Sequence, residues 1–403
     1  MFVIISSSFE HILNSVSQED LNDLTSRFLR VPSHWELPQK EVDMVNEVAS
    51  FLESENISFE LQKVEGERSN IIAHLKGNGS GRSLALVGHL DTVPPYNMKD
   101  PFSGAKKGDR IYGRGAVDMK GPDAVMLLAI AAFKRAGIEL KGDLYFAGVL
   151  AEETNSDGAE ALIESGFRTD GVIVGEPSSI EYSIGHRGLE WIEVEFTGKI
   201  AHGGYPEKGI NAILQASRFI DRVQEKIVPM LKSRHHPHMG SAVMNFGRIE
   251  GGMQPSTVAG SCTIQLDRRY IPGESVESLM KEYQGVIDEL SREDPTFRAD
   301  LRLMDIGIMN RYQHVPLETS PDDPIVDAII YGLEEVHGKT AVMSTKHGWT
   351  DAALFSHYGK MPTIVYGPGS VVRAHGPEEY ITEKELMDGL KTYILTAMKY
   401  CGI

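Results

Sequence analysis

The sequence predicts an α/β fold of two units, in which an α/β domain built on a mixed sheet is interrupted by an inserted α+β domain. Helical and strand patterns alternate through residues 1–186, and the strands there are almost continuously apolar. Such strands are typical of a sheet that is covered on both faces. From about residue 187 the strands alternate apolar and polar residues instead, which indicates antiparallel strands with one exposed face.

The first part of the chain supplies most elements of the α/β domain. Helices are predicted where apolar residues recur three or four positions apart, and strands where short apolar runs end at turn residues. The predicted elements are helices over 19–31, 40–54, 124–137 and 158–166, strands over 83–93, 142–153 and 170–177, and a glycine-rich loop over 112–123.

The inserted part has the order β-α-β-β-α-β, which predicts a split βαβ (ferredoxin-like) sandwich. Its predicted elements are strands over 188–198, 241–252, 260–271 and 298–306 and helices over 211–228 and 275–292. The α/β pattern then resumes with a helix over 324–338 and a strand over 361–369. We therefore expect one domain from residues 1–186 together with 309–403, and an inserted domain over 187–308.

The bulk composition narrows the classes of function. A chain of 403 residues with 41% hydrophobic and 24% charged residues is ordinary for a globular protein of two or three domains. Its net charge of −17 argues against nucleic-acid binding, which is carried by basic surface. The cysteines, Cys262 and Cys401, are too few for a disulfide framework or a multi-thiolate zinc site and suit a reducing cytosol. Four apolar residues after Met1 are too few for a signal-peptide core, and no stretch approaches the ~20 apolar residues of a membrane span. We expect a cytoplasmic protein without membrane partners.

Polar stretches follow the predicted strands of the α/β domain at several places. In an open α/β sheet, ligands bind beyond the carboxyl ends of the strands, so these stretches could converge in one crevice. Histidines and carboxylates without cysteine suit zinc, or cobalt or manganese, and their number suits two ions with a bridging carboxylate and one carboxylate left as a base. Taken singly, each residue equally suits a cap, a turn or a surface charge. The residues are His89 and Asp91 in GHLD, Asp118 in GAVDMKG, Glu152 and Glu153 in AEET, Glu176 in GEPSS and His375 in RAHGPEEY.

These motifs, in this order and over essentially the full length, resemble the co-catalytic metallopeptidase and deacylase family. That family includes acetylornithine deacetylase, succinyl-diaminopimelate desuccinylase, aminoacylase and the glutamate carboxypeptidases. The resemblance implies two divalent metal ions, zinc before cobalt or manganese, and a cis peptide after the bridging aspartate. By position, it implies that His89 and Glu176 hold one ion, that Glu153 and His375 hold the other, that Asp118 bridges them, that Glu152 is the general base and that Asp91 orients His89.

The resemblance extends to the inserted domain. AHGGYPEKGINAI resembles the stretch whose histidine reaches the partner's active site in a homodimer, which would make His202 an oxyanion donor; a capping or core histidine is the alternative. LDRRYIPGE makes Arg269 the expected clamp for a substrate carboxylate, with Arg268 as a competitor. Arg187 in GHRG suits either substrate binding or a structural ion pair. Ser256 stands where the family has a substrate-contacting asparagine, so the fine contacts with substrate are open.

Two further stretches call for simpler interpretations. RHHPHMG, residues 234–240, gathers three histidines away from the other motifs, and a mobile, solvated loop is favoured over a third metal site. GWTDAALF, residues 348–355, resembles a loop near the substrate, so Thr350 and Asp351 are expected to support the site rather than to bind metal.

The leading hypothesis is a metal-dependent amidohydrolase that removes an acyl group from the nitrogen of a small amino-acid-like substrate, as acetylornithine deacetylase does. Desuccinylases, deacylases of formylated or acetylated aminopyrimidines, dipeptidases and carboxypeptidases share the same motifs and remain alternatives. A non-catalytic binding protein that keeps the fold is the alternative of another class. Which acyl group and which amine are cut depends on one or two pocket contacts, which the sequence does not resolve.

Overall fold

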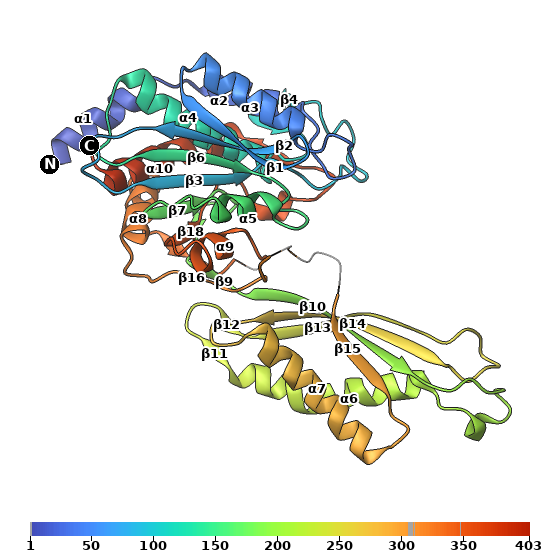
Figure 1. The fold of residues 1–403 in the computed structure, drawn as a ribbon. Helices are drawn as coiled ribbons and strands as arrows, with labels where there is room; N and C mark the ends of the chain where they lie inside the picture. The colour runs from blue at the N-terminus through green and yellow to red at the C-terminus, as the bar shows by residue number, and fades with distance from the viewer. Residues whose placement is uncertain (1, 305–308, 310, 347) are drawn as a thin grey trace.

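The computed structural model of the chain describes residues 2–304, 309, 311–346 and 348–403, with side chains from residue 7 onward. Figure 1 shows two bodies, each built around its own sheet. The larger body has a six-stranded sheet in the order β1-β2-β6-β3-β7-β18, and the smaller body has a four-stranded sheet in the order β13-β14-β10-β15. The predicted mixed α/β architecture with an inserted α+β unit is confirmed.

The six-stranded sheet is mixed. Its centre is parallel, because β3 pairs in parallel with β6 and β7, and β7 with β18. Its other edge is antiparallel, through the pairs of β2 with β1 and with β6. The strands are β1 (Ser58–Glu65), β2 (Arg68–Leu75), β3 (Leu84–His89), β6 (Leu144–Val149), β7 (Gly171–Val174) and β18 (Thr363–Val365).

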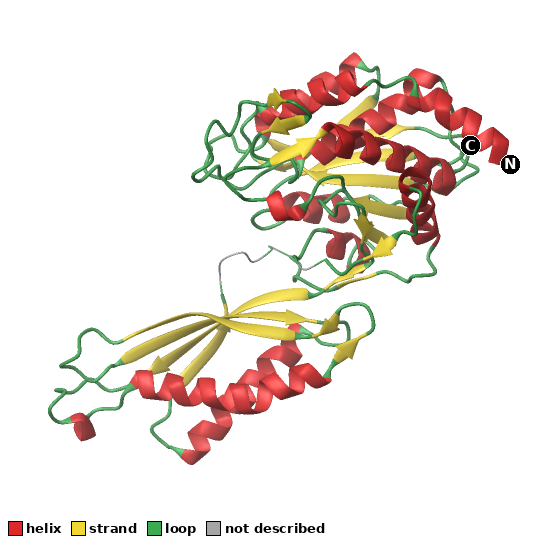
Figure 2. Cartoon of the chain, turned by 180° about the vertical axis from the view of Figure 1, so that it is seen from behind, coloured by secondary structure: helices red, strands yellow, loops and turns green. Residues whose placement is uncertain are grey.

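Helices cover both faces of this sheet (Figure 2). Successive residues of β3 point to opposite faces, and every residue of this strand is buried. Leu84 and Leu86 join the apolar core beneath the long helices α4 and α10, whereas Ala85 and Val87 join the core beneath α5 and α9. The helices of the larger body are α1 (Phe2–Leu13), α2 (Gln18–Leu29), α3 (Val42–Ser54), α4 (Lys120–Ala136), α5 (Asp157–Glu164), α8 (Pro324–His337), α9 (Ala352–His357) and α10 (Glu383–Cys401).

The smaller body follows the predicted β-α-β-β-α-β order, and all its strand pairs are antiparallel. Its two long helices pack on one face of the sheet (Figure 2). Residues 305–306 of the expected last strand, like the expected boundary at 308, lie outside the described residues, and the division at 187–308 stays a prediction. The elements are β10 (Gly188–Thr197), α6 (Ala212–Ser233), β13 (Val243–Gly251), β14 (Ser261–Tyr270), α7 (Val276–Glu293) and β15 (Ala299–Leu303).

Short elements complete the chain. One small sheet has the order β19-β5-β4, and two-stranded pairs join β11 with β12, β16 with β9 and β17 with β8. Both cysteines are free and buried, and none of the described helices is long and apolar enough to cross a membrane. The short elements are β4 (Ala105–Lys107), β5 (Arg110–Tyr112), β8 (Glu181–Tyr182), β9 (Gly185–His186), η1 (Pro206–Lys208), β11 (His235–His236), β12 (Gly240–Ser241), β16 (Leu317–Glu318), β17 (Val342–Met343), η2 (Val371–Arg373) and β19 (Tyr380–Thr382).

Candidate metal centre

Histidine and carboxylate side chains meet beyond the carboxyl ends of the parallel strands. His89 is the last residue of β3, Glu153 follows β6 and Glu176 follows β7. Asp118 lies in the glycine-rich loop just before α4, and His375 follows η2. Because β3, β6 and β7 are parallel neighbours, their ends share one edge of the sheet. The structure thus brings together the five residues that the sequence predicts as metal ligands.

The carboxylate of Asp118 lies between the two histidines. His89 Nε2 is 3.1 Å from Asp118 Oδ1, and His375 Nε2 is 3.2 Å from Asp118 Oδ2. Glu176 Oε1 lies 3.7 Å from His89 Nε2, and Glu153 Oε1 lies 3.0 Å from His375 Nε2. Each histidine therefore faces one oxygen of Asp118 and one glutamate, which is the pairing expected for two ions that share a bridging carboxylate.

The electrostatics of this cluster favour cations. Burial, followed by the charge of Glu176, raises the pKa of Glu152 well above its usual value. Burial also raises the pKa of Glu153 to about 7, although its contact with His375 opposes this shift. Glu176 Oε1 is buried and has no hydrogen-bond partner among the described residues. Crowded and incompletely paired carboxylates of this kind are costly unless positive charge is supplied. With histidine nitrogens beside them, the donor set fits divalent metal ions.

Asp91 holds the turn that brings both glutamates of AEET to the centre. Its Oδ1 accepts a hydrogen bond from the backbone N–H of Glu152 at 3.1 Å, and its Oδ2 accepts one from Glu153 at 3.0 Å. Ala151, just before them, has a positive φ of 63°. His89 Nδ1 lies 3.0 Å from the backbone carbonyl oxygen of Asp91 and 3.5 Å from Oδ1. Asp91 therefore lies beside His89, and it also fixes the backbone of the adjacent glutamates, which the sequence did not indicate.

Comparison with known proteins decides the family. The model of the Peptidase family M20/M25/M40 matches residues 85–399. The chain belongs to this family. It is 30% identical to an acetylornithine deacetylase of Myxococcus xanthus over 374 residues, which cover 90% of this chain and 93% of the relative.

Solved structures of M20 proteins share the fold of the chain. Aminopeptidase PepT of Bacillus cereus superposes with a TM-score of 0.80 at 20% identity, covering 96% of this chain and 99% of its own. YXEP of Bacillus subtilis, a dinuclear metal-binding peptidase of the M20 family, gives a TM-score of 0.70 at 17% identity, covering 96% of this chain and 99% of its own. The chain is thus an M20 metal-dependent hydrolase in fold and family.

In this M20 chain the loop that carries Asp118 is held by Glu379. Glu379 Oε1 accepts hydrogen bonds from the backbone N–H groups of Val117 at 2.9 Å and Asp118 at 3.2 Å. Its Oε2 accepts from Gly115 N at 3.2 Å and pairs with Arg114 Nη1 at 2.6 Å. The Asp118–Met119 peptide is cis, as predicted. Sequence reasoning missed Glu379 and Arg114, although both lie inside motifs that it used, RAHGPEEY and YGRGAVDMKG.

A lysine outside the predicted set also reaches the centre. Lys346 Nζ donates a hydrogen bond of 2.7 Å to Glu176 Oε2. Of the two supporting residues expected nearby, Thr350 Oγ1 lies 3.1 Å from His186 Nε2. Asp351 is fully buried, and burial raises its pKa to about 7. Lys346 stands four residues before Thr350 in a stretch that no pattern singled out.

The arginines of the inserted unit differ in environment. Arg268 is completely buried and pairs with Glu274 at 2.6 Å, which is a structural contact. Arg269 pairs with Asp267 through Nε and Nη2, at 2.7 and 2.9 Å, and stays partly exposed. Arg187 Nη2 donates to the backbone oxygen of Met239. Within the described part of the chain, no hydrogen bond or ion pair joins either Arg187 or Arg269 to the predicted metal ligands.

His202 lies far from the metal centre of its own chain. It is exposed, its Nδ1 accepts a hydrogen bond from Gly204 N at 3.0 Å, and it forms an isolated β-bridge with Thr257. The segment around η1 stands at the end of the smaller body that points away from the six-stranded sheet (Figure 1). Ser256 lies beside it, because the N–H of Gly203 donates to its backbone oxygen. One chain alone does not bring His202 to the other site residues.

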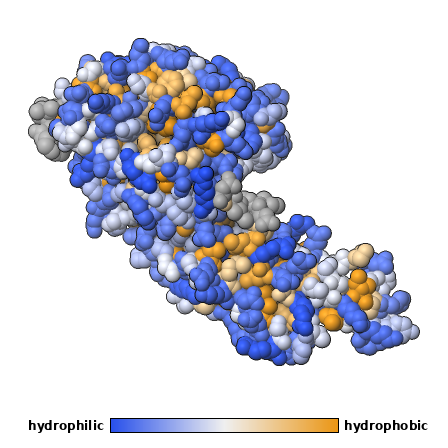
Figure 3. Space-filling model, viewed as in Figure 1, coloured by the Kyte–Doolittle hydropathy of each residue, from blue (hydrophilic) through white to orange (hydrophobic). Residues whose placement is uncertain are grey.

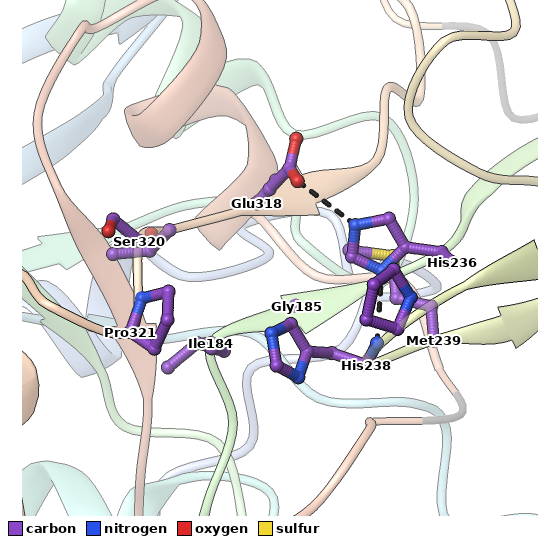
Figure 4. Close-up of a pocket in the computed structure, with 10 residues that line it drawn as sticks. Ile184, Gly185, His236, His238, Met239, Glu318, Ser320 and Pro321 are labelled. Atoms are coloured by element: carbon purple, nitrogen blue, oxygen red, sulfur yellow. Dashed lines mark hydrogen bonds and ion pairs between the residues drawn. The ribbon is translucent and has the colours of Figure 1, made fainter.

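The histidine-rich stretch 234–240 is a contact between the two bodies. It forms the short hairpin of β11 and β12, and Met239 within it is buried. His236 Nε2 lies 3.0 Å from Glu318 Oε1, and both residues line a cavity of about 350 Å³ (Figure 4). Thr345 also donates to the backbone oxygen of His238. The predicted loop is therefore a hairpin that contacts residues of the larger body, although His235 and Pro237 within it are exposed.

A third metal site at this hairpin finds no support in the described residues. The clusters of histidine and carboxylate groups that could hold a metal ion both contain His89 and lie at the edge of the six-stranded sheet.

Proposed function

We propose that this M20 enzyme hydrolyses the amide bond of a small N-acyl amino acid, with Glu152 as general base and two divalent ions held by the residues around Asp118. The pairing of His89 and His375 with the two oxygens of Asp118 carries the proposal. When bound, two divalent ions lower the pKa of water and polarise a carbonyl group. Zinc fits the histidine and carboxylate donors, and cobalt or manganese fits the same set.

Glu152 is suited to move the proton. It lies with His89 and Glu176 in a group that could hold a metal ion, so its carboxylate is within reach of water there. Burial and the charge of Glu176 raise its pKa well above the usual value, which favours uptake of a proton from water. The hydrogen bond from its backbone N–H to Asp91 limits how far Glu152 can move.

Glu152→Gln tests the base. The amide keeps the shape of the side chain but takes no proton, so we expect hydrolysis to fall by about 10²–10⁴-fold while metal content stays at the wild-type value. Glu53→Gln on the exposed face of α3 is a matched control and should hydrolyse like the wild type. A Glu152→Gln protein that keeps its metal and its full rate contradicts the assignment.

The substrate class rests on the relatives and on the arginines. Acetylornithine deacetylases are about 30% identical to the chain over most of its length, and Arg269 and Arg187 are suited to bind a substrate carboxylate. A panel of N-acetyl, N-succinyl and N-formyl substrates together with dipeptides tests it, and the preferred acyl group identifies the activity. Desuccinylase, aminopyrimidine deacylase, dipeptidase and carboxypeptidase activities are the alternatives. Absence of hydrolysis with zinc, cobalt and manganese would favour a binding protein.

We further propose a homodimer in which His202 serves the partner's site. Strand β13 forms one edge of the four-stranded sheet. Exposed apolar residues lie near the C-terminal end of β13 and close to His202 in the sequence. Figure 3 shows apolar surface on the smaller body. Pairing of two such edges would bury both the unpaired backbone and the apolar side chains. The residues are Ile200, Ile213, Leu214, Ile249 and Met253.

Mixing two inactive variants tests this arrangement. If His202 acts across the dimer, His202→Ala and Glu152→Gln proteins regain activity when they are unfolded and refolded together, because the hybrid has one complete site. The same treatment of each variant alone should restore nothing. Failure of the mixture to regain activity, or a fully active monomer in light scattering, contradicts the cross-dimer role. A cytoplasmic location, suggested by the free thiols, is part of the same proposal.

A further inference from the structure

Lys346 places one ammonium group against the candidate metal centre. Its Nζ donates to Glu176 Oε2 at 2.7 Å, and the two side chains are only 13% and 7% exposed. The backbone of Lys346 is anchored as well, because its N–H donates to Ser183 Oγ at 3.3 Å and the residue forms a β-bridge with His186. Lys346 is therefore held in place at the centre by its backbone and side-chain contacts and is not a freely moving surface residue.

The two oxygens of Glu176 have different environments. Oε2 is occupied by the ammonium group of Lys346, whereas Oε1 is buried, lacks a hydrogen-bond partner among the described residues and lies 3.7 Å from His89 Nε2. A carboxylate held in this way offers one oxygen to a metal ion. To bind through both oxygens, Glu176 would first have to release Lys346.

Among the described residues, no lysine or arginine plays this part in the other half of the centre. Glu153 and Asp118 both pair with His375, at 3.0 and 3.2 Å. Within the described ranges, neither carboxylate has an ion pair with a lysine or an arginine. The two predicted ion positions therefore differ by one fixed positive charge, which repels a nearby cation most strongly in surroundings as buried as these.

We propose that Lys346 is a positioning residue that restricts Glu176 to one ligand oxygen and makes the His89–Glu176 half the weaker of the two metal sites. This inference rests on the proposed two-metal centre. Two effects of the lysine act in the same direction, because its charge repels the ion and its hydrogen bond occupies a ligand oxygen. The ion beside Glu153 and His375 is then bound first and the ion beside Glu176 second.

Titration of the metal-free protein with Co²⁺ or Zn²⁺, followed by calorimetry, measures both dissociation constants without any assay of hydrolysis. We expect two unequal steps in the wild type. Lys346→Met removes a positive charge that repels the ion, so it should tighten the weaker step by on the order of tenfold and leave the tighter step unchanged. Lys346→Arg keeps the charge and should resemble the wild type. Lys339→Met, at an exposed position after α8, is the matched control and should leave both constants unchanged.

Lys346→Gln guards against a folding defect, because the amide can still donate to Glu176 but carries no charge; circular dichroism checks the fold of each variant. This variant should tighten the weaker step to a smaller extent than Lys346→Met. If both neutral variants leave the weaker constant unchanged, or weaken it, the inference is overturned.

The inference and the proposed function can fail separately. If the protein binds two ions unequally and Lys346→Met tightens the weaker step, but no amide is cleaved, the role of Lys346 stands and the proposed activity is wrong. If the enzyme is active but Lys346→Met leaves both metal dissociation constants unchanged, the proposed activity stands and the proposed role of Lys346 is wrong. A wild type without metal binding overturns both.

Discussion

Arg114→Met removes the positive partner of a completely buried carboxylate and should destabilise the larger body strongly. Arg114 and Glu379 are 1% and 0% exposed at their side chains, and Nη1 lies 2.6 Å from Oε2. Methionine keeps much of the apolar stem but leaves the carboxylate without its cation. Burial already raises the pKa of Glu379 above its usual value despite this pair. The variant therefore increases the free-energy cost of burying this charged carboxylate.

The size of the effect follows from the contacts that remain. Breaking a buried ion pair by removing one partner costs about 3–5 kcal/mol. Glu379 keeps three backbone donors, from Gly115, Val117 and Asp118, so we expect the lower end, about 3 kcal/mol. At about 2–4 °C per kcal/mol for domains of this order of size, the melting temperature should fall by roughly 6–12 °C.

Calorimetric melts of the metal-free protein measure this change. Arg248→Met, which breaks an ion pair with Glu250 whose side chains are 63% and 72% exposed, is the control and should change stability by less than about 0.5 kcal/mol. The double variant Arg114→Met/Glu379→Gln should be more stable than Arg114→Met, since no unpaired charge is left. If Arg114→Met melts like Arg248→Met, or the double variant melts below the single one, the reasoning is refuted.

Three further outcomes are expected. Asp91→Ala removes the acceptor for the N–H groups of Glu152 and Glu153, so the metal dissociation constant should rise by about 10–100-fold in the same calorimetric titration. A chelator should abolish hydrolysis and lower the melting temperature, and added zinc, cobalt or manganese should restore both. Burial raises the pKa of Glu190 to about 7, so the stability that protonated Glu190 contributes below pH 4.5 is lost as pH rises through 7. Glu190→Gln should therefore stabilise the protein by about 1–3 kcal/mol at pH 8 and by almost nothing at pH 4.5. Urea melts at both pH values measure this difference.

Strong local patterns predicted several elements at the centre of the fold, although the largely buried strand β2 and the long helix α10 were not predicted. The apolar run before His89 and the helical spacing of 124–137 gave elements that the structure contains as β3 and α4. Strand β1 was missed because it lies at the edge of the sheet, and none of its residues is fully buried. Its sequence, SFELQKVE, is too polar to separate an edge strand from a loop.

In the site, too, residues marked by a local sequence pattern were predicted, and residues that depend on distant partners were not. His89 and Glu176 were predicted because strand ends in an α/β sheet converge whatever the rest of the chain does, and the role of Asp118 was implied by the family resemblance of its glycine-rich loop. Glu379 and Lys346 were not, because a glutamate and a lysine in loops are ordinary surface residues until their partners are known. Those partners lie 265 and 170 residues away in the chain. Neither contact leaves a periodic or spacing signal.

The return of the chain to the larger body after the smaller one has a consequence for synthesis on the ribosome. Strand β18, His375 and Glu379 all follow residue 360, whereas the loop of Asp118 that they complete is translated much earlier. The nascent α/β unit therefore stays incomplete while more than a hundred residues of the inserted unit emerge from the ribosome. During this time one edge of its sheet is unpaired, and its crowded carboxylates lack their positive partners. Contacts so distant in sequence form late and slowly. Because the inserted unit closes its own sheet with contiguous residues, it is positioned to fold first and to hold the two halves of the α/β unit near each other until they join.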